Sequence, residues 1–313
     1  MTPSRAPDAL RFGAAVERAL AAGRPVVALE SSVFAQGLPV PANREAERRM
    51  REAIESRGAL PAITAVVRGA VTIGLEGDAL ERFLVRDGVA KVTARDLPAA
   101  MVRGTDGATT VAASLACCVA AGLEVFATGG IGGVHRDAPY DESADLTELA
   151  RSPMIVVCAG AKSILDLSAT LERLETLGVT VVGYRTAEFP GFFTAHTGLG
   201  VPARAESAEE IVAIARASRA LGRPGAVLVV QPPPAPDALD ADTVERAVAG
   251  GLARARAEGV RGAAVSPFLL AAVERETAGR SLRANLALLE ANAGLAAEIA
   301  VAATPARASR DRR

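Results

Sequence analysis

The chain has 313 residues, and its 35 basic and 36 acidic side chains give a formal net charge of −1. Charges of both signs are interspersed, so the chain has no long-range field that would attract a polyanion. Trp is absent and aromatic residues make up only 3% of the sequence, which argues against stacking platforms for single-stranded nucleic acid. We therefore do not expect a nucleic-acid partner.

The three cysteines, Cys117, Cys118 and Cys158, fit neither a disulfide framework nor the spacing of a zinc site. No N-terminal stretch has the residue order of a signal peptide. The most apolar run, residues 111–122, is shorter than the roughly 20 residues that a membrane span needs. These features predict a protein of the reducing cytoplasm with no membrane partner.

Six short apolar, β-branched runs alternate with longer amphipathic segments that we interpret as helices. The predicted strands are residues 26–30, 63–67, 125–128, 154–158, 179–184 and 226–231. Continuously apolar strands are typical of a mostly parallel sheet with helices on both faces. We therefore predict an α/β protein, a three-layer α/β/α sandwich that forms one domain over residues 1–313, with a short N-terminal arm and a disordered tail from about residue 304.

Local signals predict three boundaries. Ser207 followed by Glu210 indicates a capping box at a helix start. Ser266 with Pro267 indicates a helix cap followed by proline at the first helical position. The proline-rich residues 231–240 are expected to form a rigid surface loop.

Ligands of open α/β sheets bind beyond the carboxyl ends of the strands, so polar residues there are the first candidates for a site. Glu30 directly follows the strand at 26–30, where desolvation should raise the carboxyl pKa above about 4.3 and suit the group to proton donation. The alternative is a carboxylate that caps the next turn or pairs with an arginine. Position alone does not decide between them.

The loop at 128–146 is rich in glycine and in acidic residues. Its glycines could let backbone amides approach a phosphate, but the glycines alone favour a plain turn. Oxygen ligands at this density suit Mg²⁺ or Mn²⁺ with retained waters. Taken alone, the pattern favours the alternative, a solvated acidic loop or acidic charges at a helix N-terminus. The side chains concerned are His135, Asp137, Asp141, Glu142 and Asp145.

Lys162 follows the strand at 154–158, and Lys91 is the other lysine of the chain. We predict that Lys162 lies between a buried strand and a helix start, where lost hydration and the positive helix end lower its pKa from about 10.4 and suit it to imine formation. The alternative is a snorkelling lysine at a sheet edge. Lys91, close to Arg95 and Asp96, is expected to stay charged and to hold an anion or a carbonyl group.

Asn285 and Asn292 lie seven residues apart and so share one face of a predicted helix near the C-terminus. A buried amide must find hydrogen-bond partners. These two side chains could contact a ligand, or they could bond between helices within an oligomer core. The spacing leaves both possibilities open.

Many separate motifs, in one order, resemble the pseudouridine-5′-phosphate glycosidase family from about residue 12 to 303. They include VALESSVFAQGLPVPAN, KVTARDLP, GATTVAAS, FATGGIGGVHR, SADLTELAR, AGAKSILDLSATLE and NLALLEANA. The resemblance implies a trimeric α/β enzyme that uses a divalent metal, typically Mn²⁺. It also implies the reversible conversion of pseudouridine 5′-phosphate and water to uracil and ribose 5-phosphate.

The resemblance assigns roles to individual residues. Lys162 would be the covalent nucleophile, Glu30 the proton donor and Asp141 the metal ligand. The loop between His135 and Asp141 is shorter than in the family, which leaves Asp137 as the alternative ligand. The implied substrate contacts are Lys91, the backbone around Val111, Ser143, Ala144 and Asp145, with His135 and Asn285 near the pocket.

Two other functions compete with this one. A class I aldolase or a related Schiff-base lyase would also use a lysine at a strand end and a phosphate site, but it would not need uracil. A nucleotide-binding regulatory protein would have no turnover. Such a protein would have no reason to keep a reactive, desolvated amine at Lys162.

Overall fold

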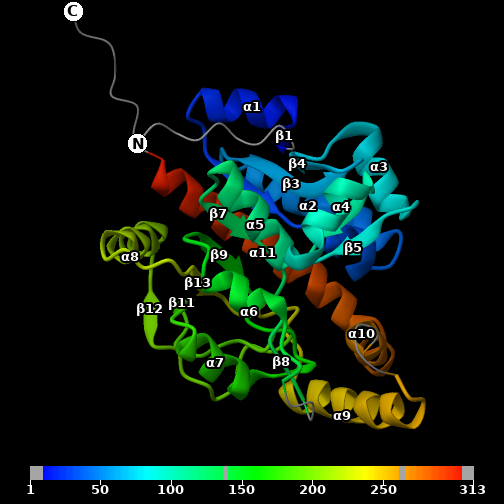
Figure 1. The fold of residues 1–313 in the computed structure, drawn as a ribbon. Helices are drawn as coiled ribbons and strands as arrows, with labels where there is room; N and C mark the ends of the chain where they lie inside the picture. The colour runs from blue at the N-terminus through cyan, green and yellow to red at the C-terminus, as the bar shows by residue number, and fades with distance from the viewer. Residues whose placement is uncertain (1–9, 137–139, 261–264, 305–313) are drawn as a thin grey trace, which may run out of the picture.

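The computed structural model describes residues 10–136, 140–260 and 265–304. The residues of the predicted N-terminal arm and of the tail beyond Thr304 lie outside these ranges, as does Asp137. Eleven strands form a central sheet, and all six predicted strands belong to it. The fold is thus the predicted α/β sandwich (Figure 1).

The six predicted strands are neighbours in the sheet and run parallel, in the order β3-β2-β7-β9-β13-β11. Their side chains are almost all buried because helices cover both faces. The strands are β2 (Val26–Leu29), β3 (Leu60–Val67), β7 (Val125–Ala127), β9 (Ile155–Cys158), β11 (Thr180–Tyr184) and β13 (Val227–Val230).

Short strands that the sequence did not predict extend this sheet. Antiparallel pairing of the long strand β3 with β4 (Ala70–Ile73) and β6 (Gly107–Thr109) turns the chain back toward the end of β2. The remaining strands of the sheet are β1 (Leu10–Phe12), β5 (Ala90–Val92) and β12 (Ala203–Ala205). A separate antiparallel pair joins β8 (Val134–His135) to β10 (Leu165–Asp166).

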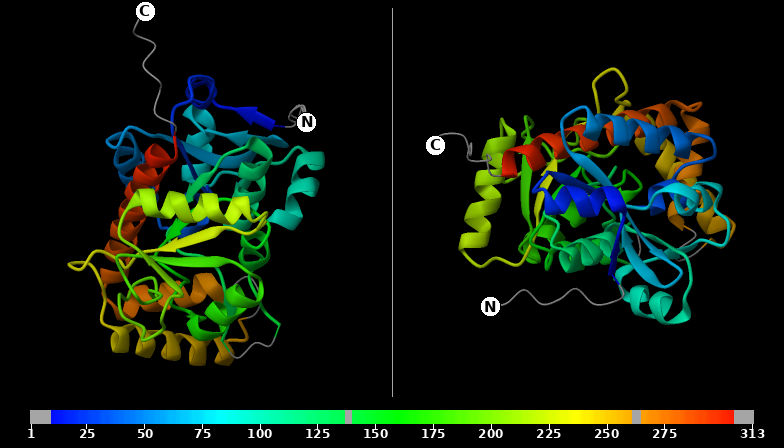
Figure 2. Two further views of the ribbon diagram at one scale, coloured as in Figure 1. Left: turned by 90° about the vertical axis from the view of Figure 1, so that its left-hand side faces the viewer. Right: turned by 90° about the horizontal axis from the view of Figure 1, so that it is seen from above.

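Helices cover both faces of the sheet. Helix α5 lies on one face with α6, and α2 and α11 pack together on the other (Figures 1 and 2). The helices are α1 (Ala14–Ala21), α2 (Ala42–Glu55), α3 (Gly77–Val85), α4 (Leu97–Arg103), α5 (Val111–Ala121), α6 (Ala144–Leu149), α7 (Leu167–Thr176), α8 (Ala208–Ala220), α9 (Ala241–Ala257), α10 (Val265–Glu276) and α11 (Arg280–Ala303). Two short helices, η1 (Val33–Gly37) and η2 (Ala94–Asp96), follow Ser32 and Thr93.

Helix α11 is the core helix of the second face. Among the described residues, it alone is long and apolar enough to cross a membrane by length and composition, yet 56% of its most apolar stretch is buried inside the fold. It packs against β2, β7 and β9. Its apolar composition is therefore accounted for by burial against the sheet.

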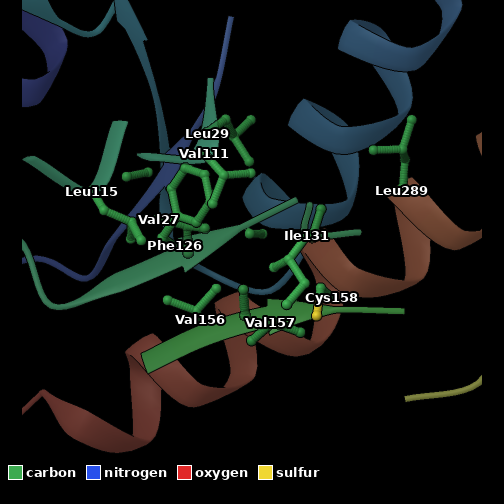
Figure 3. Close-up of a cluster of buried hydrophobic side chains, with 14 of the residues drawn as sticks. Val27, Leu29, Val111, Leu115, Phe126, Ile131, Val156, Val157, Cys158 and Leu289 are labelled. Carbon is green, nitrogen blue, oxygen red and sulfur yellow. The ribbon is translucent and has the colours of Figure 1, made fainter. Parts of the chain in front are cut away.

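The hydrophobic core lies on both sides of the central strands (Figure 3). Val27, Phe126 and Val156 are fully buried. Burying a side chain of this size contributes about 1.5–3 kcal/mol. Cys117, Cys118 and Cys158 are also buried and free.

The predicted boundaries are partly right. Ser207 caps α8 by accepting a hydrogen bond from the Glu210 amide at 3.2 Å, but the Glu210 carboxylate accepts from the Glu206 amide and not from Ser207, so only half of the capping box forms. The cap predicted at Ser266 is wrong, because α10 already includes Val265. Residues 231–240 form the predicted loop, between β13 and α9.

Candidate active site

The site lies where three parallel neighbours, β2, β7 and β9, end at one edge of the sheet. Glu30 directly follows β2, Thr128 directly follows β7, and Lys162 lies four residues beyond the end of β9. Since parallel strands place their carboxyl ends together, this topology brings residues more than 130 positions apart into one site.

Glu30 is a buried carboxyl group held by two hydroxyl groups. Only 8% of the residue is exposed. The Thr128 hydroxyl donates to Oε1 at 2.5 Å, and the Ser32 hydroxyl donates to Oε2. Burial raises the pKa of Glu30, although the nearby charge of Lys162 and the two hydroxyl groups act in the opposite direction. This is the predicted direction of the shift. In the part of the chain that the structure describes no arginine pairs with Glu30, and the carboxyl group instead accepts from Ser32 in the turn that follows it.

Lys162 lies in a tightly bonded turn. Its amide donates to the Ile131 carbonyl at 3.1 Å, and its own carbonyl accepts from the Leu165 amide at 2.9 Å. The Arg136 guanidinium binds the carbonyls of Ser163 and Leu165, both at 3.1 Å. The prediction that Lys162 opens a helix is wrong, because β10 intervenes and α7 begins only at Leu167. The positive end of that helix therefore does not explain the position of the lysine.

The glycines beside Lys162 are required by close packing. A Cβ atom on Gly132 would lie 2.2 Å from the Ser143 hydroxyl oxygen, and one on Gly133 would lie 2.3 Å from that of Thr170. The Gly132 amide is already bonded to the Asp145 carboxylate at 2.8 Å. These contacts favour the plain-turn interpretation of the loop over a phosphate cradle.

Asp145 ties this loop to the start of α5. The residue is 6% exposed, and its second oxygen accepts from the Ala112 amide at 2.9 Å. Val111, beside that amide, is the buried first residue of α5. The Ser143 hydroxyl caps α6, and Ala144 is the exposed first residue of that helix. The other three predicted contacts, Val111, Ser143 and Ala144, thus lie next to Asp145 or next to an amide that it binds.

Lys91 reaches the site through the added strands. It lies on β5 opposite Ala108 of β6, the strand that leads into α5. Burial and the charge of Lys162 lower the pKa of Lys91, against the smaller effects of Glu30 and Asp145. The shift acts against the charged form of Lys91, and that Lys91 stays charged and holds an anion or a carbonyl group remains a prediction. Its sequence neighbours Arg95 and Asp96 pair with each other at 3.5 Å.

Sequence reasoning missed a network of buried hydroxyl groups behind Glu30. The Thr109 hydroxyl lies 3.2 Å from that of Ser31 and 2.9 Å from that of Thr64. The Thr64 hydroxyl also bonds Ser114, at 2.8 Å. The motifs ESS and GATTVAAS contain three of the four residues, but only the pairing of β3 with β6 brings them together.

The two asparagines of α11 have different surroundings. Asn292 is fully buried and bonds to the Thr128 and Gly129 carbonyls and to Gln231 of the same chain, so an oligomer contact is not needed to explain it. Asn285 is half-buried, two helical turns earlier, and its side chain bonds to none of the residues that the structure describes. Asn285 is therefore left available for a ligand.

Few side chains among the described residues could bind a metal ion. Asp141 is exposed and bonds His135 only through its backbone, Glu142 pairs with Arg173 at 2.8 Å, and Asp145 is occupied by two amides. No group of three potential ligand side chains occurs among the described residues. The residues present therefore fit an ion that binds one carboxylate and otherwise keeps its waters.

His135 lies near the nucleophile candidate. It is half-buried on β8, directly opposite Leu165 of β10, three residues after Lys162. The imidazole is thus carried on the small sheet that continues the Lys162 turn.

Comparison with known proteins identifies the family of this chain. The family described as indigoidine synthase A like protein matches residues 15–302. The protein named pseudouridine-5′-phosphate glycosidase of Gemmatimonas aurantiaca is 64% identical over 93% of this chain and 95% of its own length. The protein of the same name from Chloroflexus aurantiacus is 53% identical over 93% of this chain and 98% of its own length.

Two solved structures are similar throughout the fold. The prealnumycin C-glycosynthase AlnA, solved in complex with ribulose 5-phosphate, has a TM-score of 0.88 and 38% identity, covering 94% of this chain and 97% of its own. An indigoidine synthase A-like protein of Thermotoga maritima has a TM-score of 0.83 and 40% identity, covering 89% of this chain and 93% of its own. The chain therefore belongs to the indigoidine synthase A like family, together with the enzymes named pseudouridine-5′-phosphate glycosidase.

Proposed function

We propose that this enzyme is a pseudouridine-5′-phosphate glycosidase that reversibly converts pseudouridine 5′-phosphate and water to uracil and ribose 5-phosphate through a lysine imine. The observation that carries the proposal is the position of Glu30, a buried carboxyl group with a raised pKa, at the same edge of the sheet as the Lys162 amine, whose charge acts on it. The names of the relatives and the ribulose 5-phosphate complex of the AlnA enzyme support a sugar phosphate as substrate.

The bond to be broken joins two carbons, so protonating a leaving oxygen or nitrogen, as ordinary glycosidases do, is not enough. In the first step Glu30 gives its proton to the ring oxygen of the ribose. The bond between that oxygen and the anomeric carbon breaks as the neutral Lys162 amine bonds to the same carbon. The sugar is now an open chain attached to Lys162, and Glu30 is ionised.

In the second step the ionised Glu30 takes a proton from the new ammonium nitrogen, whose freed lone pair forms a carbon–nitrogen double bond as the carbon–carbon bond to uracil breaks. The electron pair stays on the uracil ring carbon, which takes up the proton from Glu30 and leaves as uracil. Water then adds to the protonated imine carbon, the bond to the Lys162 nitrogen breaks, and ribose 5-phosphate is released as the remaining proton returns to Glu30. Each step uses only water, the substrate and groups of the site.

The other predicted contacts surround this chemistry. Substrate-binding roles fall to Lys91, the backbone at Val111, Ser143, Ala144, Asp145, His135 and Asn285. A divalent cation, with Mn²⁺ the first choice, would bind Asp141 and keep most of its waters, which would order the pocket. We also propose that the enzyme is a homotrimer and is located in the cytoplasm.

The direct experiment incubates the protein with Mn²⁺, uracil and ribose 5-phosphate and measures pseudouridine 5′-phosphate by chromatography and mass spectrometry. The expected result is product formation that requires all three additions. A Schiff-base lyase acting on the sugar phosphate alone would consume ribose 5-phosphate without uracil. No turnover in either direction would contradict the proposed function.

A further inference from the structure

Thr128 is the side chain through which the glycine loop touches Glu30. It is 1% exposed, and its hydroxyl donates to Glu30 Oε1 at 2.5 Å. Its amide donates to the Val157 carbonyl of β9 at 3.0 Å. The direction of the Thr128 side chain is therefore set by the contacts that fix the backbone of this residue.

Asn292 holds the other side of that backbone unit from α11. Its Nδ2 donates to the Thr128 carbonyl at 2.8 Å and to the Gly129 carbonyl at 3.2 Å. Its Oδ1 accepts from Gln231 Nε2 at 2.9 Å. Every hydrogen-bonding atom of this fully buried amide is thus committed, and Gln231 fixes which way it faces.

We propose that Asn292 is a positioning residue for Glu30: by fixing the Thr128 backbone from α11, with Gln231 behind it, it keeps the Thr128 hydroxyl on the Glu30 carboxyl group. This inference rests on the proposed function, in which Glu30 is the proton donor. It adds two residues of the C-terminal half, Gln231 and Asn292, to the control of that donor. We expect neither residue to contact the substrate.

The proposal predicts the direction in which the pKa of Glu30 changes when these contacts are removed. The charged groups acting on Glu30 are Lys162, which favours its ionised form, and Asp145, which disfavours it. Lys91 interacts with all three. The hydroxyl groups of Ser32 and Thr128 favour the ionised form as well. Removing the Thr128 contact should therefore raise the pKa of Glu30 and leave the neighbouring charges unchanged.

The test compares Thr128→Val, Asn292→Ala and the double variant with the wild type. Because a general acid must be protonated, activity is lost as pH rises through its pKa. Each single variant should move the high-pH limb of kcat/KM upward by about one pH unit, the effect of one hydrogen bond to an ionised group. The double variant should shift no further than Thr128→Val, since Asn292 acts through Thr128.

Asn43→Ala is the matched control for lost packing. Asn43 is also a fully buried helix asparagine, and it donates to the Phe34 and Leu84 carbonyls at 2.9 and 2.8 Å, neither of which belongs to a residue that bonds Glu30. Asn43→Ala should lower the midpoint temperature of thermal unfolding without moving the high-pH limb of kcat/KM. Gln231→Ala, at a half-buried position, should give a smaller upward shift and serves if Asn292→Ala does not fold.

Any one of three results would overturn the inference. The high-pH limb of kcat/KM could stay in place in both Asn292→Ala and Gln231→Ala, or the shifts of Asn292→Ala and Thr128→Val could add in the double variant. The third such result is a shift of this limb in Asn43→Ala equal to that in Asn292→Ala. A titration of the ¹³C-labelled Glu30 carboxyl by NMR, assigned with Glu30→Gln, measures the same pKa without turnover. If the wild type proves inactive, the proposed function fails. The NMR titration still decides whether Asn292 acts on Glu30.

Discussion

Glu30 and Lys162 lie beyond the carboxyl ends of β2 and β9, with β7 between the two strands, and the charge of the lysine acts on the buried carboxyl group. Burial outweighs that charge, so the pKa of Glu30 is raised. A carboxyl group that keeps its proton beside an amine can act as an acid while the amine attacks. Both groups of the proposed reaction therefore come from one edge of the sheet.

Lys162→Ala should abolish turnover and leave the fold intact, because the side chain is only partly buried and the bonds that hold its turn are made by backbone atoms and by Arg136. Lys162→Arg should be equally inactive, since a guanidinium group stays protonated and cannot attack carbon. Activity is measured by uracil release and the fold by circular dichroism. A folded Lys162→Ala variant that retains one-tenth of the wild-type rate would rule out the imine mechanism.

Glu30→Gln should still bind substrate but lose a factor on the order of 10² to 10⁴ in rate, the usual cost of removing an acid–base group. Gln keeps the size of the side chain and can still accept the Thr128 hydrogen bond. Single-turnover kinetics separate the chemical step from binding. A weaker affinity with an unchanged single-turnover rate would show that Glu30 binds the substrate and does not transfer the proton.

The same variant should change how stability depends on pH. A carboxyl group with a raised pKa in the folded state binds more protons there than in the unfolded chain, so its contribution to stability is lost as pH rises from the unfolded pKa to the folded one. Relative to the wild type, Glu30→Gln should gain stability with pH across that window and then level off. Urea unfolding at several pH values measures this difference, and parallel curves for the two proteins would argue against a raised pKa.

Removing divalent metal should suppress activity, because the acidic loop around Asp141 is the proposed position of the ion. The protein is treated with excess EDTA, its metal content is measured, and Mn²⁺ is then restored. Activity should fall and recover. Asp141→Asn should weaken the Mn²⁺ dependence without unfolding the protein, because the carboxylate is exposed and forms no ion pair with the described residues. Full activity in verified metal-free protein would remove the loop from the mechanism.

The central strands and the position of Glu30 were predictable because buried parallel strands are continuously apolar in sequence. Strands such as β5 and β6 were not, since three-residue runs contain no distinctive pattern. Those short strands bring Lys91 and Thr109 to the site, so the lowered pKa of Lys91 could not be foreseen.

The polar support of Glu30 was equally hidden. Thr128 was predicted only as the last residue of a strand, and Asn292 had two open explanations. Their connection joins residues 164 positions apart, a separation over which spacing rules say nothing. The helix start predicted at Lys162 failed for a related reason: the two-residue strand β10 exists only because β8 lies beside it.

The most direct test of the central claim is to trap the imine. The enzyme is treated with ribose 5-phosphate and borohydride, and the modified residue is located by peptide mapping. Lys91 and Lys162 interact with each other, so both amines are near the expected ligand and the experiment offers a real choice. A stable sugar adduct on Lys162 alone, absent in Lys162→Arg, is the predicted result. An adduct on Lys91, or none on an active enzyme, would contradict the assignment of Lys162 as nucleophile.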